Sequence, residues 1–114
     1  MPCAVVSAST NCREVLEAAG IETLFDARVD GIVAEREGLA GKPAPDTFLA
    51  AASLLHVEPA HGAVFEDALA GVAAGRAGGF GWVVGVDRGG DPGALRQRGA
   101  DVVVRDLGEL LEDA

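Results

Sequence analysis

The sequence predicts an α/β domain with a parallel sheet that is covered by helices on both faces. Apolar runs such as "AVVS", "GWVVGVD" and "DVVV" are too short to alternate with polar residues, which is typical of strands buried on both faces. Stretches with helical periodicity separate these runs along the chain. Because ligands of open α/β sheets bind at the carboxyl ends of the strands, we expect functional residues directly after strands.

The expected strands are short apolar runs at residues 4–7, within 27–34, and at 62–67, 81–87 and 101–104. The expected helices cover residues 11–20, 45–57, 68–78, 92–98 and 106–113. The first helix places Val15, Leu16 and Ala19 on one apolar face and ends at Gly20. Asp46 is the expected cap of the second helix.

Composition narrows the class of protein. The 114 residues suffice for one domain, and a hydrophobic share of 49% suits a packed core. A formal charge of −9 argues against nucleic-acid and anionic-membrane partners, and an aromatic share of 4% argues against a base-stacking surface. The chain has no apolar run near ~20 residues and no signal-peptide pattern. Its two cysteines form no CxxC pair, so we expect a cytoplasmic protein with reduced thiols.

The first polar segment, "SASTN" at residues 7–11, follows the first strand. Hydroxyl groups and the free N–H groups of a starting helix can bind an anion. The same residue types are also ordinary helix caps, and that interpretation is favoured for this segment alone.

The second polar segment contains Lys42 within "GLAGKPAPD" at residues 38–46, which we expect to follow the second strand. Pro43 and Pro45 restrict the backbone beside the lysine, and a held ammonium before a helix suits a phosphoryl group. A solvated loop lysine is the alternative, and the two interpretations carry similar weight.

The third polar segment is the adjacent pair Glu66 and Asp67 at the end of "GAVFED". Repulsion and desolvation oppose two carboxylates at the end of a buried strand, and a bound cation would remove both objections. Mg²⁺ takes one or two carboxylates and keeps several waters. The alternative is that the acids only favour the start of the next helix, which explains one acid better than two.

The ordered set "SAST", "GKPAPD" and "VFEDALAGV" resembles the haloacid dehalogenase (HAD) superfamily, in particular its β-phosphoglucomutase-like sugar-phosphate branch. The resemblance covers nearly the whole chain. It implies a Rossmann-like core that transfers phosphoryl groups through an aspartyl-phosphate with Mg²⁺. By resemblance, Ser7, Ala8 and Asn11 are the phosphate-binding residues. Lys42 neutralises nucleophile and phosphate as a catalytic residue, and Glu66 and Asp67 bind the metal.

The sequence departs from this superfamily at its start. Members begin with a DxD strand, whose first aspartate is the nucleophile, and a helical cap follows. We find neither, and Asp26, Asp30, Asp87 and Asp91 form no DxD pair. Residues 1–114 are therefore expected to form a single partial core domain that lacks the first core strand and the cap. The absent strand normally lies centrally, between the strands that end at the serine and at the acid pair.

Without that strand we expect unpaired strand edges and an apolar groove. Low stability, or a second chain or copy covering the groove, should follow. Two functions remain open. One is the C-terminal core of a Mg²⁺-dependent sugar-phosphate mutase or phosphatase, acting on a phosphorylated sugar or other small phosphate ester and inactive alone without its nucleophile. The other is a non-catalytic remnant or a module that binds a phosphorylated ligand or a partner. Arg88, after the fourth strand, could contact an anion, although "DRGGDPG" is more typical of a turn.

Overall fold

Short parallel strands alternate with helices throughout the structure, a computed structural model that describes residues 2–8 and 10–112. The elements run in the order β1 (Ala4–Val6), α1 (Cys12–Ala19), η1 (Glu22–Leu24), β2 (Ala27–Val29), α2 (Gly31–Glu37), α3 (Asp46–Leu54), η2 (Pro59–His61), β3 (Ala63–Glu66), α4 (Leu69–Ala77), β4 (Trp82–Val86), α5 (Pro92–Gln97), β5 (Val102–Val104) and α6 (Gly108–Glu112). The expected α/β class is confirmed. The end of the last expected helix, residue 113, lies outside the described residues.

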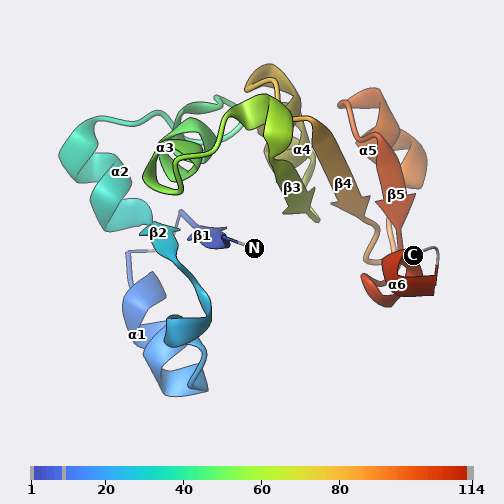
Figure 1. The fold of residues 1–114 in the computed structure, drawn as a ribbon. Helices are drawn as coiled ribbons and strands as arrows, with labels where there is room; N and C mark the ends of the chain where they lie inside the picture. The colour runs from blue at the N-terminus through green and yellow to red at the C-terminus, as the bar shows by residue number, and fades with distance from the viewer. Residues whose placement is uncertain (1, 9, 113–114) are drawn as a thin grey trace.

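The strands of the described chain form two parallel sheets. β1 pairs with β2, and β3, β4 and β5 pair in that order. Within the described chain, β1 and β3 therefore each keep one unpaired edge. Figure 1 shows the two sheets as separate groups of strands, with β1 and β3 on the sides that face each other. The sheet is interrupted where the resemblance places the central strand.

The core lies between the three-stranded sheet and the helices α3, α4 and α5. Its buried cluster consists of Phe48, Ala52, Val64, Val72, Ala74, Phe80, Val83 and Leu95. The rings of Phe48 and Phe80 meet edge to face with their centroids 6.0 Å apart. Val6 of β1 packs against the same cluster, and α3 contacts both β1 and β2. Helix α3 and its neighbours thus hold the two sheets together although no strand joins them.

Several large apolar side chains remain exposed. Phe65 and Trp82 are 52% and 53% exposed, and the pairing of Phe65 with Val84 and of Ala63 with Trp82 places them on one face of the sheet. The predicted apolar face of α1 is also uncovered, since Val15 is 55% exposed and only Cys12 is buried in that helix. These side chains leave apolar surface exposed on the sheet and on α1.

Two local expectations were wrong. Helix α2 follows β2 directly, because the buried Asp30 caps it by accepting a hydrogen bond from Val33 N at 2.9 Å. Lys42 therefore lies after α2, and it does not directly follow a strand as expected. Asp46 is the first residue of α3 and not its cap, since its carboxylate accepts from Ala40 N at 3.0 Å. No helix in the described part of the chain is long and apolar enough to cross a membrane.

Candidate active site

Lys42 and Glu66 are brought together although 24 positions separate them in the sequence. The Lys42 Nζ atom lies 2.5 Å from Glu66 Oε1, and the two side chains are only 22% and 12% exposed. A turn closed by Ala44 N and Gly41 O, 3.0 Å apart, shapes the backbone around the lysine. The ammonium also lies 4.9 Å from the centre of the Phe48 ring, on the first turn of α3. Two of the three predicted segments thus meet at the carboxyl end of β3.

Glu66 occupies space that only a glycine leaves free. A Cβ atom at Gly71, on the first turns of α4, would lie 2.1 Å from Glu66 Cδ. The carboxylate therefore rests against the helix backbone, within 3.5 Å of Ala68 N. This contact explains why residue 71 is a glycine. A Cβ at Gly75 would lie 3.3 Å from Val64, so α4 also approaches the sheet closely at this position.

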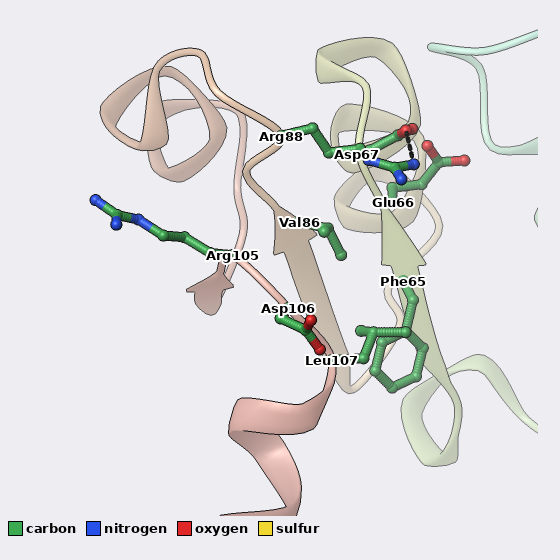
Figure 2. Close-up of a pocket in the computed structure, with 8 residues that line it drawn as sticks. All are labelled: Phe65, Glu66, Asp67, Val86, Arg88, Arg105, Asp106 and Leu107. Atoms are coloured by element: carbon green, nitrogen blue, oxygen red, sulfur yellow. Dashed lines mark ion pairs between the residues drawn. The ribbon is translucent and has the colours of Figure 1, made fainter.

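Asp67 has the opposite environment. Its side chain is 52% exposed, and its Oδ2 atom lies 3.5 Å from Nη1 of Arg88, which is itself 74% exposed. Figure 2 shows Arg88 folding back from the end of β4 toward Asp67 above an open cavity. The cavity measures about 450 Å³ and is lined by Phe65, Glu66, Asp67, Val86, Arg88, Arg105, Asp106 and Leu107. Both acids therefore face cations, but of different kinds and at different depths.

The predicted phosphate-binding residues belong to the other sheet. Ser7 directly follows β1, and its backbone N–H donates to Val29 O at 2.9 Å, which extends the pairing with β2. Ala8 is exposed in the loop, and Asn11 stands at the N-cap of α1 without a side-chain capping bond. The expected positions after a strand and before a helix are confirmed for this segment, while its phosphate role remains a prediction.

A third acid at the carboxyl end of a strand, Asp30, has a structural role that the sequence did not indicate. It is 2% exposed, caps α2, and its Oδ2 atom lies 3.0 Å from Arg28 Nε. Burial raises the pKa of Asp30, but the hydrogen bond from Val33 N and the charge of Arg28 outweigh burial and hold the pKa below the usual value.

The other candidate nucleophiles also accept hydrogen bonds from backbone N–H groups. Asp26 accepts from Cys3 N at 2.7 Å, Asp87 from Gly90 N at 2.8 Å, and Asp91 from Ala94 N at 3.1 Å. Asp87 and Asp91 thereby fix a turn and a helix start, whereas Asp26 ties the residue before β1 to the residue before β2. Their bonding is that of structural residues, as is that of Asp30.

Glu66 and Asp67 fit part of a Mg²⁺ site. Both supply the hard oxygen atoms that Mg²⁺ prefers, and both are already paired with a side-chain cation. Across the described residues, no group of three or more Asp, Glu, His or Cys side chains gathers closely enough to hold a metal ion. The pair can therefore contribute two ligands, and water or another segment would have to complete the coordination.

Arg88 is the residue of this site that the sequence identified least clearly. The sequence indicates at most an anion contact within a turn, because a single arginine after a strand is a weak signal. Its position at the carboxyl end of β4, the neighbour of β3, is what places it beside Asp67.

Comparison with known proteins gives matches over nearly the whole chain. Residues 2–79 match the family of haloacid dehalogenase-like hydrolases. A β-phosphoglucomutase of Mycobacterium bovis is 58% identical over 111 residues, covering 95% of this chain and 42% of that protein. A trehalose-phosphate phosphatase of Mycobacterium leprae is 38% identical over 112 residues, covering 95% of this chain and 24% of that protein. The chain thus spans less than half the length of these curated relatives.

Solved structures show the same fold. A HAD phosphatase from Thermococcus onnurineus superposes with a TM-score of 0.83 at 27% identity, covering 98% of this chain and 49% of that one. A β-phosphoglucomutase from Clostridium difficile gives a TM-score of 0.72 at 30% identity, covering 91% and 44%. The resemblance drawn from the sequence motifs is confirmed, and the chain belongs to the haloacid dehalogenase-like hydrolases.

Proposed function

We propose that this chain is part of a Mg²⁺-dependent enzyme that transfers a phosphoryl group to or from a sugar phosphate. The single observation that carries the proposal is the meeting of Lys42 with Glu66, with Asp67 beside them, at the carboxyl end of β3. An ammonium and two carboxylates at a strand end suit a phosphate and a divalent cation together. The names of the relatives, β-phosphoglucomutase and trehalose-phosphate phosphatase, support a sugar phosphate as substrate.

Each residue has a proposed role. Glu66 and Asp67 hold the metal, which when bound would neutralise charge on the transferred phosphoryl group. Lys42 is the catalytic cation that stabilises negative charge on the nucleophile and the phosphate. The phosphate is bound by Ser7, Ala8 and Asn11, which lie in the segment between β1 and α1.

We further propose that residues 1–114 form one partial core domain, completed by a strand that carries the nucleophilic aspartate. The facing edges of β1 and β3 are unpaired in the described chain, and a parallel strand could pair with both. Thr47 Oγ1, on the α3 helix that contacts β1 and β2, is buried without a hydrogen-bond partner in the described structure. An added strand, from a further segment, a second chain or a second copy, would cover this region.

Without that strand the chain is expected to be catalytically silent. A carboxylate nucleophile forms the covalent intermediate, and neither Lys42 nor a metal ion replaces it. The candidate aspartates elsewhere accept structural hydrogen bonds from backbone N–H groups, as described above.

A second candidate function is a non-catalytic module that binds a phosphorylated ligand or a protein partner. The observation that favours it is that the acid pair has no third ligand among the described residues. Such a module would keep the Lys42–Glu66 pair as a structural contact and would bind ligand without turnover.

The experiment is an assay of Mg²⁺-dependent turnover of p-nitrophenyl phosphate and β-glucose 1-phosphate. The purified chain is measured alone and then with a DxD strand and cap segment supplied in trans, after circular dichroism has shown that the mixture is folded. Activity only after complementation, lost in Lys42→Met, supports the proposal. Activity of the chain alone would show that residues 1–114 already contain a nucleophile. A folded but inactive mixture would favour the binding module.

A further inference from the structure

Arg88 and Lys42 neutralise neighbouring carboxylates in different ways. Lys42 is largely buried against Glu66 and Phe48. Arg88 contacts Asp67 at the edge of the cavity, where both side chains are exposed to solvent. If the proposed metal site is correct, we propose that Arg88 is an internal counter-cation for Asp67. It holds this carboxylate while no divalent cation is present, and a divalent cation must displace it in order to bind.

The loop that carries Arg88 is held on both sides of this residue. Asp87 Oδ1 accepts from Gly89 N and Gly90 N at 3.3 and 2.8 Å, and Asp87 N donates to Val104 O at 2.7 Å. Directly after the glycines, Asp91 caps α5. The backbone position of Arg88 is thereby fixed while its side chain remains 74% exposed. The guanidinium can therefore leave Asp67 by side-chain rotation alone, without rearrangement of the loop.

The other arginine of the cavity shows that the contact is specific. Arg105 follows β5 and lines the same cavity, yet Figure 2 shows its side chain extending away from Asp67. Asp106, also at the cavity, accepts from Gly108 N at 2.7 Å and so serves the start of α6. Of these charged neighbours, Arg88 is the one that an ion pair joins to Asp67.

The strength of the contact decides how it can act. An exposed ion pair contributes at most about 1 kcal/mol, equivalent to about a fivefold change in an equilibrium constant. That is weak enough for a divalent cation to break the pair, and strong enough to reduce occupation of Asp67 by Na⁺ or K⁺. Arg88 is thus a residue that tunes the affinity and the charge selectivity of the site, and it is not a metal ligand.

The test is a calorimetric titration with Mg²⁺ at fixed ionic strength. Arg88→Gln is expected to bind Mg²⁺ about three- to fivefold more tightly than the unmodified chain, because the competing cation is gone. Arg105→Gln removes the same charge from the same cavity and is the matched control, with a change below about 1.5-fold. Arg88→Lys keeps a cation at this position, so its Mg²⁺ affinity should stay close to that of the unmodified chain. The difference between Arg88→Gln and the unmodified chain should shrink as salt is raised.

The outcomes separate this inference from the proposed function. If Mg²⁺ binds the unmodified chain and Asp67→Asn abolishes binding, but Arg88→Gln behaves like Arg105→Gln, only the inference is overturned. Weaker binding by Arg88→Gln would also overturn it, since Arg88 would then support the metal site. If neither the unmodified chain nor Arg88→Gln binds Mg²⁺, alone or with the complementing segment of the turnover assay, the proposed metal site fails and the inference fails with it.

Discussion

Glu66 and Asp67 are neighbours in the sequence but have different physical roles in the molecule. The side chain of Glu66 is 12% exposed, pressed against the backbone at Gly71 and joined to Lys42. The side chain of Asp67 is 52% exposed, and in the described part of the chain its ion pair is with Arg88, which is 74% exposed. Successive residues at a strand end point in different directions, which separates the two carboxylates. Glu66 is therefore fixed in position by contacts within the fold, whereas Asp67 is more accessible to solvent.

The largest effect is expected at Gly71. In Gly71→Ala the new Cβ would occupy the position of the Glu66 carboxylate, so this side chain must move away from Lys42. Misplacement of a catalytic group by about 1 Å can cost about 100-fold in rate, and we expect a loss of that order in the complemented enzyme. The readout is Mg²⁺-dependent turnover under the conditions described above.

Gly90→Ala is the matched control, because a Cβ there would meet nothing closer than 3.9 Å in the loop beside Arg88. It should retain most of the activity. Full activity in Gly71→Ala would show that the position of Glu66 against α4 is not needed.

Asp30 is an acid at a strand end with no assigned ligand role, and it should affect stability alone. Replacing it by alanine removes the α2 cap and the bond to Arg28, at a cost of about 2 kcal/mol in the free energy of unfolding at neutral pH. Because its folded-state pKa is lowered, its contribution is present above the ordinary Asp value and is lost as the pH falls through the folded-state pKa.

Urea unfolding of both proteins between pH 7 and pH 2.5 measures this dependence. The difference in the free energy of unfolding between the unmodified chain and Asp30→Ala should shrink below about pH 4. A difference that stays constant down to the lowest pH would contradict the assignment of the lowered pKa to these contacts.

The coupling energies of the two ion pairs should differ. Double-mutant cycles with Lys42→Met and Glu66→Gln, and with Arg88→Gln and Asp67→Asn, measure each coupling in the free energy of unfolding. We expect about 1 to 2 kcal/mol for the partly buried pair and below about 0.5 kcal/mol for the exposed pair. Equal couplings would remove the distinction between the two acids.

The sequence predicted the strands well because each is a short apolar run followed by polar residues, and it placed Lys42, Glu66 and Ser7 at or near the correct end of the sheets. It does not predict α2, because the hydrogen bond from Val33 N to Asp30 that starts this helix lies inside an apolar run with the pattern of a strand. Periodicity identified the apolar face of α1 but could not show that Val15 would remain exposed, because exposure depends on which elements pack there. The Asp67–Arg88 contact depends on the pairing of β3 with β4, which no local pattern encodes.

The contrast between the two acids is tested most directly by thermal unfolding of the unmodified chain and of Asp67→Asn, each with and without Mg²⁺. Without Mg²⁺ the two Tm values should agree within about 2 °C, because Asp67 contributes little to the fold. At a Mg²⁺ concentration about 100-fold above Kd, the unmodified chain should gain about 2.7 kcal/mol, or roughly 10 °C in Tm, and Asp67→Asn should not gain it. An equal rise in both proteins, or a large loss of Tm in Asp67→Asn without Mg²⁺, would contradict the account.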